Sequence, residues 1–302
     1  MLNIDTIGPP LLLTTFFIEF LITVIHQAKH QVVKDMLANV LMGLFTIVTG
    51  AIMKGVALGL YSFFYSFAIF TPVLSWWLWV IGFFLCELIH YFYHRLGHKT
   101  RLFWAGHVAH HSSVHFNFSI GLRVNFLHLL YRFLFWTPLC LIGIPPEMIL
   151  FFESLTAIWN FLIHAEKVKK LGVLDWFLNT PSNHRVHHAS NPEYIDKNLG
   201  GITVIYDHLF KTYIKETITP VYGITHNIDT HNPVKILTHE YKFIIETVSK
   251  IRGWGKKIRF LFTPPGENSY QSELNADVKN DTGEFSYSKT PFQNLKQATA
   301  SN

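Results

Sequence analysis

Long hydrophobic runs separated by short polar turns dominate the first half of this chain. Residues 9–28 form a run of membrane-spanning length that contains one carboxylate, Glu19. A cleaved signal peptide is an alternative, but no basic region precedes the run and no small-residue cleavage site closes it, which favours an uncleaved span. A second run covers residues 36–53, and after Lys54 the chain stays apolar and aromatic through residues 55–70.

Three further apolar runs follow a predicted break at Pro72. Residues 73–93 form another predicted span. The runs 124–141 and 147–164 flank the turn signal Gly143-Ile144-Pro145-Pro146, which predicts a hairpin of helices. The whole pattern predicts an all-α integral membrane bundle of about four to five hydrophobic helices.

The chain becomes more polar after Glu166. Residues 241–262 mix Ile, Phe and Trp with basic residues that include Lys250, Arg252, Lys256, Lys257 and Arg259. This mixture suits a basic amphipathic segment on the membrane surface, and an ordinary solvated helix packed on the domain is an equal alternative. We expect residues 1–265 to form a single membrane-embedded domain, and we expect the polar, aperiodic residues 266–302 to be disordered.

The composition supports a membrane protein. Of the 302 residues, 49% are hydrophobic and only 15% are charged, where soluble domains have about 25% charged residues. The net charge of +5 is spread over loops, which favours a basic membrane-facing side and argues against nucleic-acid binding. By the positive-inside rule that side is predicted to be cytoplasmic, and it carries Lys29, Lys34, Arg95, Lys99, Arg101, Lys167, Lys169 and Lys170. Cys86 and Cys140 lie in apolar runs, so we expect free, buried thiols.

Histidines form three dense sets between the hydrophobic runs. The sets are His94 with His98, His107 with His110 and His111, and His184 with His187 and His188. Residues three and four apart share one face of a helix, so the rings of each set should point the same way. Eight imidazoles exceed the four ligands of one tetrahedral ion, and two metal ions sharing eight or nine nitrogens fit the number. A lone histidine is more often a surface or core residue, but clustered imidazoles without a metal would repel or leave polar atoms unpaired.

The surroundings of these sets resemble the fatty acid hydroxylase superfamily, also called the sterol desaturase family. The resemblance covers residues 87–213 and runs through Glu87, His94-Arg95-Leu96-Gly97-His98, Phe103-Trp104-Ala105-Gly106-His107-Val108-Ala109-His110-His111-Ser112, Asn183-His184-Arg185-Val186-His187-His188, Asn198-Leu199-Gly200-Gly201 and Asp207-His208-Leu209-Phe210. The region from Tyr222 to Gly266 looks most like the alkylglycerol monooxygenase-like branch. Glu87 departs from the family in standing where Asp is common.

The resemblance implies a membrane-bound di-iron enzyme that uses O2 to hydroxylate or otherwise oxidise a C–H bond of a lipid. It implies nine metal ligands, which are His94, His98, His107, His110, His111, His164, His184, His187 and His188. Metal-bound imidazoles usually give their other N–H to a carboxylate or carbonyl, for which Glu87, Glu166, Asp175 and Asp207 are candidates. Asn183, His90 and His115 are further candidates for supporting the site, and His115 is also a candidate ligand or lipid-headgroup contact.

Ligand type alone does not choose the metal, because imidazole suits Fe, Zn, Cu and Ni. A zinc-dependent membrane lipid hydrolase and a non-catalytic lipid-binding membrane protein therefore remain alternatives. The expected partners are the membrane, a lipid substrate, and a separate electron donor, either a protein or a diffusible reductant, since the sequence shows no nucleotide fingerprint or fused haem domain.

Overall fold

A computed structural model describes residues 4–25 and 30–266 of the chain. Within these residues all regular elements are helices, joined by loops, and the β-pairing consists of two isolated bridges, Leu178 with Thr203 and Ala189 with Tyr222. The predicted all-α class is therefore confirmed for the described part of the chain. Lys29 and the tail from residue 267, for which we predicted a basic turn and disorder, lie outside it.

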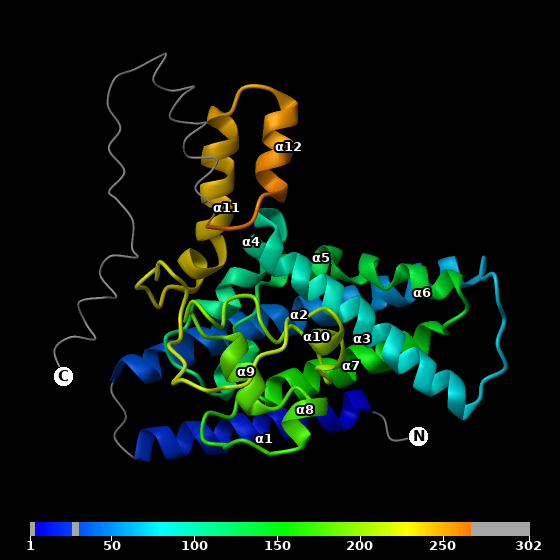
Figure 1. Cartoon of the computed structure of the whole chain (residues 1–302), viewed down its shortest axis with the longest axis horizontal. Helices are drawn as coiled ribbons and strands as arrows, with labels where there is room; N and C mark the ends of the chain where they lie inside the picture. The colour runs from blue at the N-terminus through cyan, green and yellow to red at the C-terminus, as the bar shows by residue number, and fades with distance from the viewer. Residues whose placement is uncertain (1–3, 26–29, 267–302) are drawn as a thin grey trace. The chain divides into compact units, whose positions relative to one another are not determined.

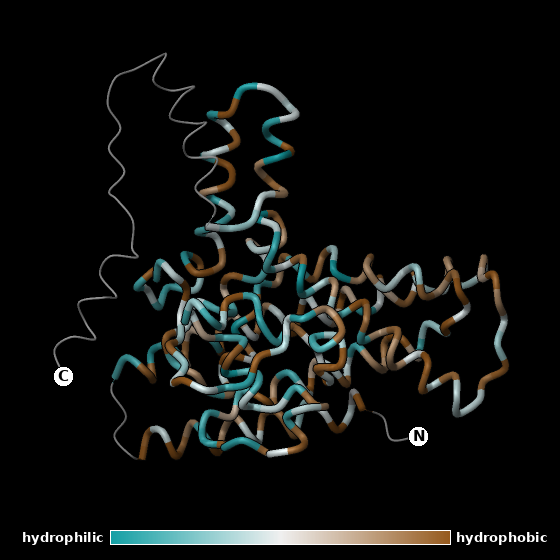
Figure 2. The backbone as a smooth tube through the Cα atoms, viewed as in Figure 1, coloured by the Kyte–Doolittle hydropathy of each residue, from teal (hydrophilic) through white to brown (hydrophobic). Residues whose placement is uncertain are grey.

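Among residues 4–25 and 30–266, three helices are long and apolar enough to cross a membrane. They are α1 (Ile4–Ile25), α2 (His30–Tyr65) and α3 (Trp76–Lys99), and hydrophobic residues predominate along them (Figures 1 and 2). Apolar side chains such as Phe45 and Val48 stay exposed on their outer faces, as lipid contact requires.

The apolar runs on either side of Lys54 belong to one helix. Helix α2 runs without a break through both apolar runs, and the Lys54 ammonium donates a hydrogen bond to Ser154 Oγ at 3.1 Å. This polar partner lies on another helix, so the sequence around Lys54 gives no sign of it. The break at Pro72 is confirmed, because the segment between α2 and α3 contains this residue.

The predicted helical hairpin has one irregular arm. Its first arm is a series of short turns, η2 (Phe126–His128), α5 (Leu129–Arg132), η3 (Phe133–Phe135) and α6 (Thr137–Leu141), and its second is the single helix α7 (Pro146–Leu162). Gly143 joins the arms with φ of +95°, and a Cβ there would collide with the carbonyl oxygen of Phe70. The predicted number of four to five hydrophobic helices in the membrane stays a prediction, because it depends on how the hairpin meets the membrane.

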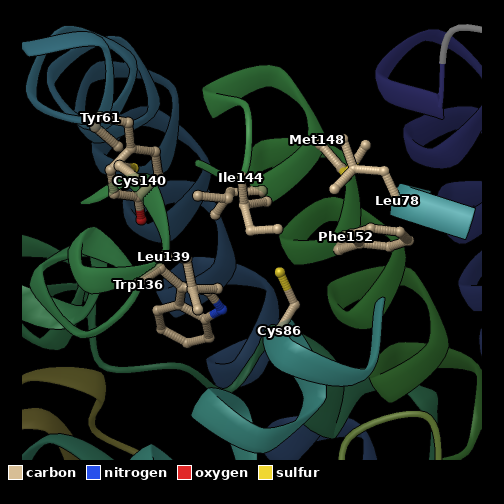
Figure 3. Packing of buried hydrophobic residues seen from close by; sticks show 11 residues of the cluster. Tyr61, Leu78, Cys86, Trp136, Leu139, Cys140, Ile144, Met148 and Phe152 are labelled. Carbon is tan, nitrogen blue, oxygen red and sulfur yellow. The ribbon is translucent and has the colours of Figure 1, made fainter. Parts of the chain in front are cut away.

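The hydrophobic core lies between α2, α3 and the hairpin. Tyr61 of α2, Cys86 of α3 and Phe152 of α7 pack together with Trp136 and Cys140 (Figure 3). Both cysteines are free and buried, as expected. This core fixes α3 against α7, and these two helices lead directly to histidines of the site.

A polar cap follows the end of α3. It contains α4 (Arg101–His111), η1 (Phe118–Leu122), α8 (Leu174–Phe177), α9 (Pro181–His187) and α10 (Ile205–Leu209). The buried Arg123 fastens the cap to α2, since its Nη1 donates to Asp35 Oδ1 at 3.0 Å and to Asn39 Oδ1 at 2.8 Å. Its Nε donates to the carbonyl oxygen of Ala109 at 2.7 Å, which fixes the last turn of α4.

Two helices form the end of the described chain, α11 (Pro233–Lys250) and α12 (Trp254–Phe262). Gly253, with φ of +92°, lies at the turn between them. The predicted amphipathic segment 241–262 therefore comprises the second half of α11 and all of α12.

Candidate metal centre

Nine histidines gather into two groups in which the potential ligand nitrogens lie within 4.8 Å of one another. We call them the five-histidine group (His94, His98, His107, His111 and His187) and the four-histidine group (His110, His164, His184 and His188). The groups adjoin, because the rings of His111 and His188 stack with centroids 4.4 Å apart. All nine predicted ligand residues are thus brought together, and His164, which lies outside the dense sets, is fully buried among them.

Helix geometry divides the dense sets between the two groups. His107 and His111 are four residues apart on α4 and belong to the same group, as do His184 and His188 at the end of α9. His110 precedes His111 and belongs to the other group, because neighbouring residues on a helix point about 100° apart. Each His-His doublet therefore supplies one ring to each group, and the expectation that all rings of a set share one direction is wrong.

The ring nitrogens are spaced as ligands of a common ion would be. The Nε2 atom of His107 lies 3.0 Å from Nε2 of His94 and 3.0 Å from Nε2 of His111. In the four-histidine group, Nε2 of His164 lies 3.0 Å from Nε2 of His184 and 3.3 Å from Nε2 of His188. Nitrogens bound about 2.0–2.1 Å from one ion lie about 3.0–3.4 Å apart at adjacent positions.

Three rings of the five-histidine group are oriented by acceptors on their outer side. The Nδ1–H of His94 donates to the Leu199 carbonyl oxygen at 2.8 Å, and that of His187 donates to the Lys197 carbonyl oxygen at 3.0 Å. His98 Nδ1 lies 3.3 Å from Asp196 Oδ1. Since a neutral imidazole carries one N–H, these bonds leave Nε2 with a bare lone pair facing the other rings.

Those lone pairs provide a test of whether a metal ion fits. Nε2 of His98 and Nε2 of His187 are buried and have no hydrogen-bond partner among the described residues. Several bare nitrogens facing one another would leave buried polar atoms unsatisfied, whereas a cation between them would satisfy all of them. The donor set therefore fits a bound metal ion.

The protonation state of the rings also suits metal binding. Burial lowers the pKa of the rings in α4 and at the end of α9 well below the ordinary value, and neighbouring imidazoles lower it further; these rings are His107, His110, His111, His184, His187 and His188. The six rings are therefore neutral at neutral pH, which is the form that binds metal.

The predicted carboxylates support the site less directly than expected. Glu87 Oε2 accepts from the backbone N–H of Ile202 at 2.9 Å and of Thr203 at 2.8 Å. Asp207 accepts from the backbone N–H groups of Leu199 and Gly200, both at 2.8 Å. The two carboxylates hold the loop whose Leu199 carbonyl orients His94, and the expected direct contact with an imidazole N–H is absent among the described residues because backbone donors occupy these oxygens.

Glu166 and Asp175 also bind groups other than the rings. Glu166 accepts from the Tyr222 hydroxyl at 2.6 Å, and Asp175 accepts from Thr180 Oγ1 at 2.5 Å near the start of α9. Asn183 supports α9 in the same region, where its Nδ2 donates to the carbonyl oxygens of Asp175 and Leu178 at 2.7 and 2.9 Å.

The remaining two candidates lie outside both groups. His90 is one turn before His94 on α3, with ring centroids 5.7 Å apart, and it lines the cavity described next. His115 lies on a separate groove beside α1, together with Glu19 and Phe116. The structure therefore does not bring His115 into either histidine group.

A cavity of about 260 Å³ opens beside both groups. Its wall includes His94 and His107 of one group and His110, His164 and His184 of the other. Away from the histidines it reaches Leu129, Arg132 and Ala157, which also line a second cavity of about 160 Å³ next to α2. The two cavities therefore share part of their lining, on the side of α2 and α7.

Asp196 is the residue of the site that the sequence did not reveal. It adopts φ of 60° and precedes Lys197 and Leu199, whose carbonyl oxygens orient two other rings. Asp and Asn are the non-glycine residues that best tolerate the left-handed region, which Asp196 and Asn198 both adopt, so they are compatible with a tight turn, but nothing in the sequence indicates the contact with His98.

Comparison with known proteins extends these observations. Residues 79–212 match the family model for fatty acid hydroxylase. The alkylglycerol monooxygenase of Danio rerio is 33% identical over 262 residues, which cover 85% of this chain and 58% of that protein. The alkylglycerol monooxygenase of Homo sapiens is 31% identical over 293 residues, which cover 95% of this chain and 66% of that protein. An ornithine lipid hydroxylase of Rhizobium tropici is 32% identical over 135 residues, or 44% of this chain and 41% of that protein.

The chain spans less than two thirds of the length of each of these three relatives. No solved structure matches it. Fold and site define the class as a membrane-embedded helical protein with clustered imidazoles suited to metal ions. Through residues 79–212 the chain belongs to the fatty acid hydroxylase family.

Proposed function

We propose that this protein is a lipid monooxygenase that holds two iron ions and uses O2 to hydroxylate a C–H bond of a membrane lipid. The observation that carries the proposal is the pair of histidine groups, with buried nitrogens at ligand spacing, beside a cavity that leads to the membrane helices. The family and the names of the relatives, alkylglycerol monooxygenase and ornithine lipid hydroxylase, support the reaction class. An alkylglycerol is therefore the first substrate to test, followed by fatty acyl and sterol-like lipids.

The nine histidines would hold the ions, one in each group. When bound, iron supplies the redox chemistry that activates O2 toward an unactivated C–H bond. The protein's own residues fix the ring directions, through Leu199, Lys197 and Asp196, and they keep the rings neutral by burial. Glu87 and Asp207 would act as positioning residues, because they hold the loop that carries the Leu199 carbonyl.

The cavity would position the lipid. It shares Leu129, Arg132 and Ala157 with the second cavity next to α2, so a lipid chain that enters between α2 and α7 and passes these residues would approach the rings from the membrane side. Replacing Ala157 with Phe should narrow the passage, raise KM for long-chain substrates and leave the metal content unchanged. An unchanged KM across chain lengths would exclude this route.

The arrangement in the membrane is also part of the proposal. We propose that residues 1–265 act as one membrane-embedded domain with the histidine groups on the cytoplasmic side, and that electrons come from a separate donor. The basic residues of the cap support this side. Tags after His115 and at Asn302 should both resist a protease added outside intact cells, and digestion of either tag would refute the orientation.

Metal analysis combined with an oxygen-dependence assay tests the function. Purified protein should contain iron, and hydroxylated lipid should form only when O2 and a reductant are present. Zinc without iron, together with lipid hydrolysis in the absence of O2, would establish the zinc hydrolase instead. His110→Ala should abolish turnover, whereas a lipid-binding protein that keeps the cluster for stability would lose only thermal stability. Lipidomics of cells with and without the protein would identify the substrate.

A further inference from the structure

Helices α11 and α12 combine a strong positive charge with an exposed apolar face. Residues 233–262 contain seven Lys and Arg against two Glu. On α12, Trp254, Ile258 and Phe262 are 80, 55 and 53% exposed. Their spacing of four residues places them on one face of the helix. Such a row of large apolar side chains is unusual on a surface that faces only water.

The base of this helix pair is fixed close to the end of a candidate membrane span. Helix α3 ends at Lys99, and the backbone N–H of Arg101 donates to the Thr263 carbonyl oxygen at 2.9 Å. The Arg101 guanidinium lies 5.2 Å from the ring of Phe243 on α11 and 4.9 Å from that of Phe260 on α12. The pair therefore begins where α3, a candidate membrane span, ends.

The direction of the pair fits a position along the membrane surface. Figure 1 shows α11 and α12 running crosswise to α2, and Figure 2 shows hydrophobic and hydrophilic residues mixed along both. A helix that runs crosswise to α2 and is fixed at the end of α3 is placed to lie in the headgroup region. Trp and basic side chains are both favoured there, because Trp is amphipathic and Lys extends its charge toward water. The Lys257 ammonium lies 5.3 Å above the Trp254 ring, so cation and aromatic ring occur together on α12.

We propose that α11 and α12 form an interfacial hairpin that binds the anionic headgroups of the membrane surrounding the protein. The apolar face of α12 enters the boundary between headgroups and acyl chains, and the Lys and Arg side chains bind lipid phosphate and carboxylate groups. An acidic protein partner would satisfy the charges but not the apolar row, whereas an anionic membrane surface satisfies both. The hairpin thereby fixes the depth of α4, which carries three of the nine histidines.

Site-specific fluorescence of the full-length protein tests this inference. An environment-sensitive label is attached to Ile258→Cys in nanodiscs of phosphatidylcholine, with or without phosphatidylserine. The native cysteines are buried, so labelling is selective. A label at Lys256→Cys is the matched control, because it lies two residues away and points about 200° around the same helix. We expect a blue shift and quenching by lipid-borne nitroxide at position 258, both stronger with phosphatidylserine, and quenching by aqueous iodide at position 256.

A charge-reversed protein separates charge from simple hydrophobicity. Lys242→Glu, Lys250→Glu and Lys257→Glu together should remove the effect of phosphatidylserine on the label at position 258, while circular dichroism stays unchanged. Iodide quenching at position 258 equal to that at position 256 in anionic nanodiscs would overturn the inference and leave the face to a protein partner. An effect of phosphatidylserine that survives charge reversal would also overturn it.

Discussion

Asp196→Asn should weaken metal binding at the five-histidine group without unfolding the protein. The Asp196 carboxylate lies 3.3 Å from His98 Nδ1 and pairs with the Lys99 ammonium. Burial raises the pKa of Asp196, but His98 and Lys99 outweigh burial and bring it to about 2, so the group is charged at neutral pH. Asparagine keeps the size of the side chain and the tolerance of φ near 60°, and removes only the charge.

The size of the effect follows from the geometry. Loss of an outer partner of a metal-bound histidine costs about 10–100-fold in metal affinity, or roughly 1.4–2.8 kcal/mol. The side chain of Asp196 is 23% exposed, and its contact with His98 is long at 3.3 Å. Both features reduce the interaction, so we expect the lower end, about tenfold.

Chelator competition on the full-length protein in nanodiscs measures this change. Iron should leave Asp196→Asn at about a tenfold lower chelator concentration than it leaves the native protein. Two controls isolate the carboxylate. Lys99→Met keeps the contact between Asp196 and His98 and should shift affinity by less than about twofold, because exposed ion pairs contribute little. Asp196→Ala adds the backbone cost of a left-handed alanine, so it alone should also lower the melting temperature.

Either of two results would refute this reasoning. Native affinity in Asp196→Asn would show that the carboxylate does not support His98. An equal loss in Lys99→Met would show that the local net charge, and not the orientation of the ring, controls the ion.

Three other changes test separate parts of the structure. His164→Ala should reduce bound iron from two ions toward one and abolish turnover, and full iron content with normal turnover would remove His164 from the site. Arg123→Met leaves Asp35 buried without its cation and should destabilise the protein by about 3–5 kcal/mol in thermal or denaturant unfolding, with partial recovery on adding Asp35→Asn. Burial alone would raise the pKa of Glu216, but its contacts with Arg185 have the larger effect, so the pKa lies below the ordinary value of 4.5. The stabilisation from this pair is therefore complete above pH 4.5 and lost as pH falls through the folded-state pKa, and Glu216→Gln should flatten the melting temperature in that range.

The parts of the fold and the site that could be predicted from the sequence are those that follow a regular pattern of residues along the chain. Hydrophobic length identified the candidate spans, and histidine spacing identified three sets on helices. The division of these sets between the two histidine groups could also have been predicted, because His110 and His111 must point in different directions on any helix. In this site a spacing of four residues keeps two rings in the same group, and a spacing of three places them in different groups.

The outer partners could not be predicted because they come from an irregular loop. Two of the three acceptors are backbone carbonyl oxygens, of Lys197 and Leu199, and a carbonyl leaves no mark on the sequence. Glu87 was identified from a resemblance, but its partners are backbone N–H groups more than a hundred residues away. The position of Lys54 within a helix could not be predicted for the same reason, because its hydrogen-bond acceptor is the hydroxyl of Ser154, which is far away in the sequence.

The His-His doublets have a consequence for how the protein would acquire its ions. Because α4 and α9 each supply rings to both histidine groups, whichever ion binds first would immobilise both helices. The conformational entropy lost in that step would not be lost again, so the second ion would meet a group that is already assembled. Loading would then be cooperative, and at limiting metal most chains would carry either no ion or two.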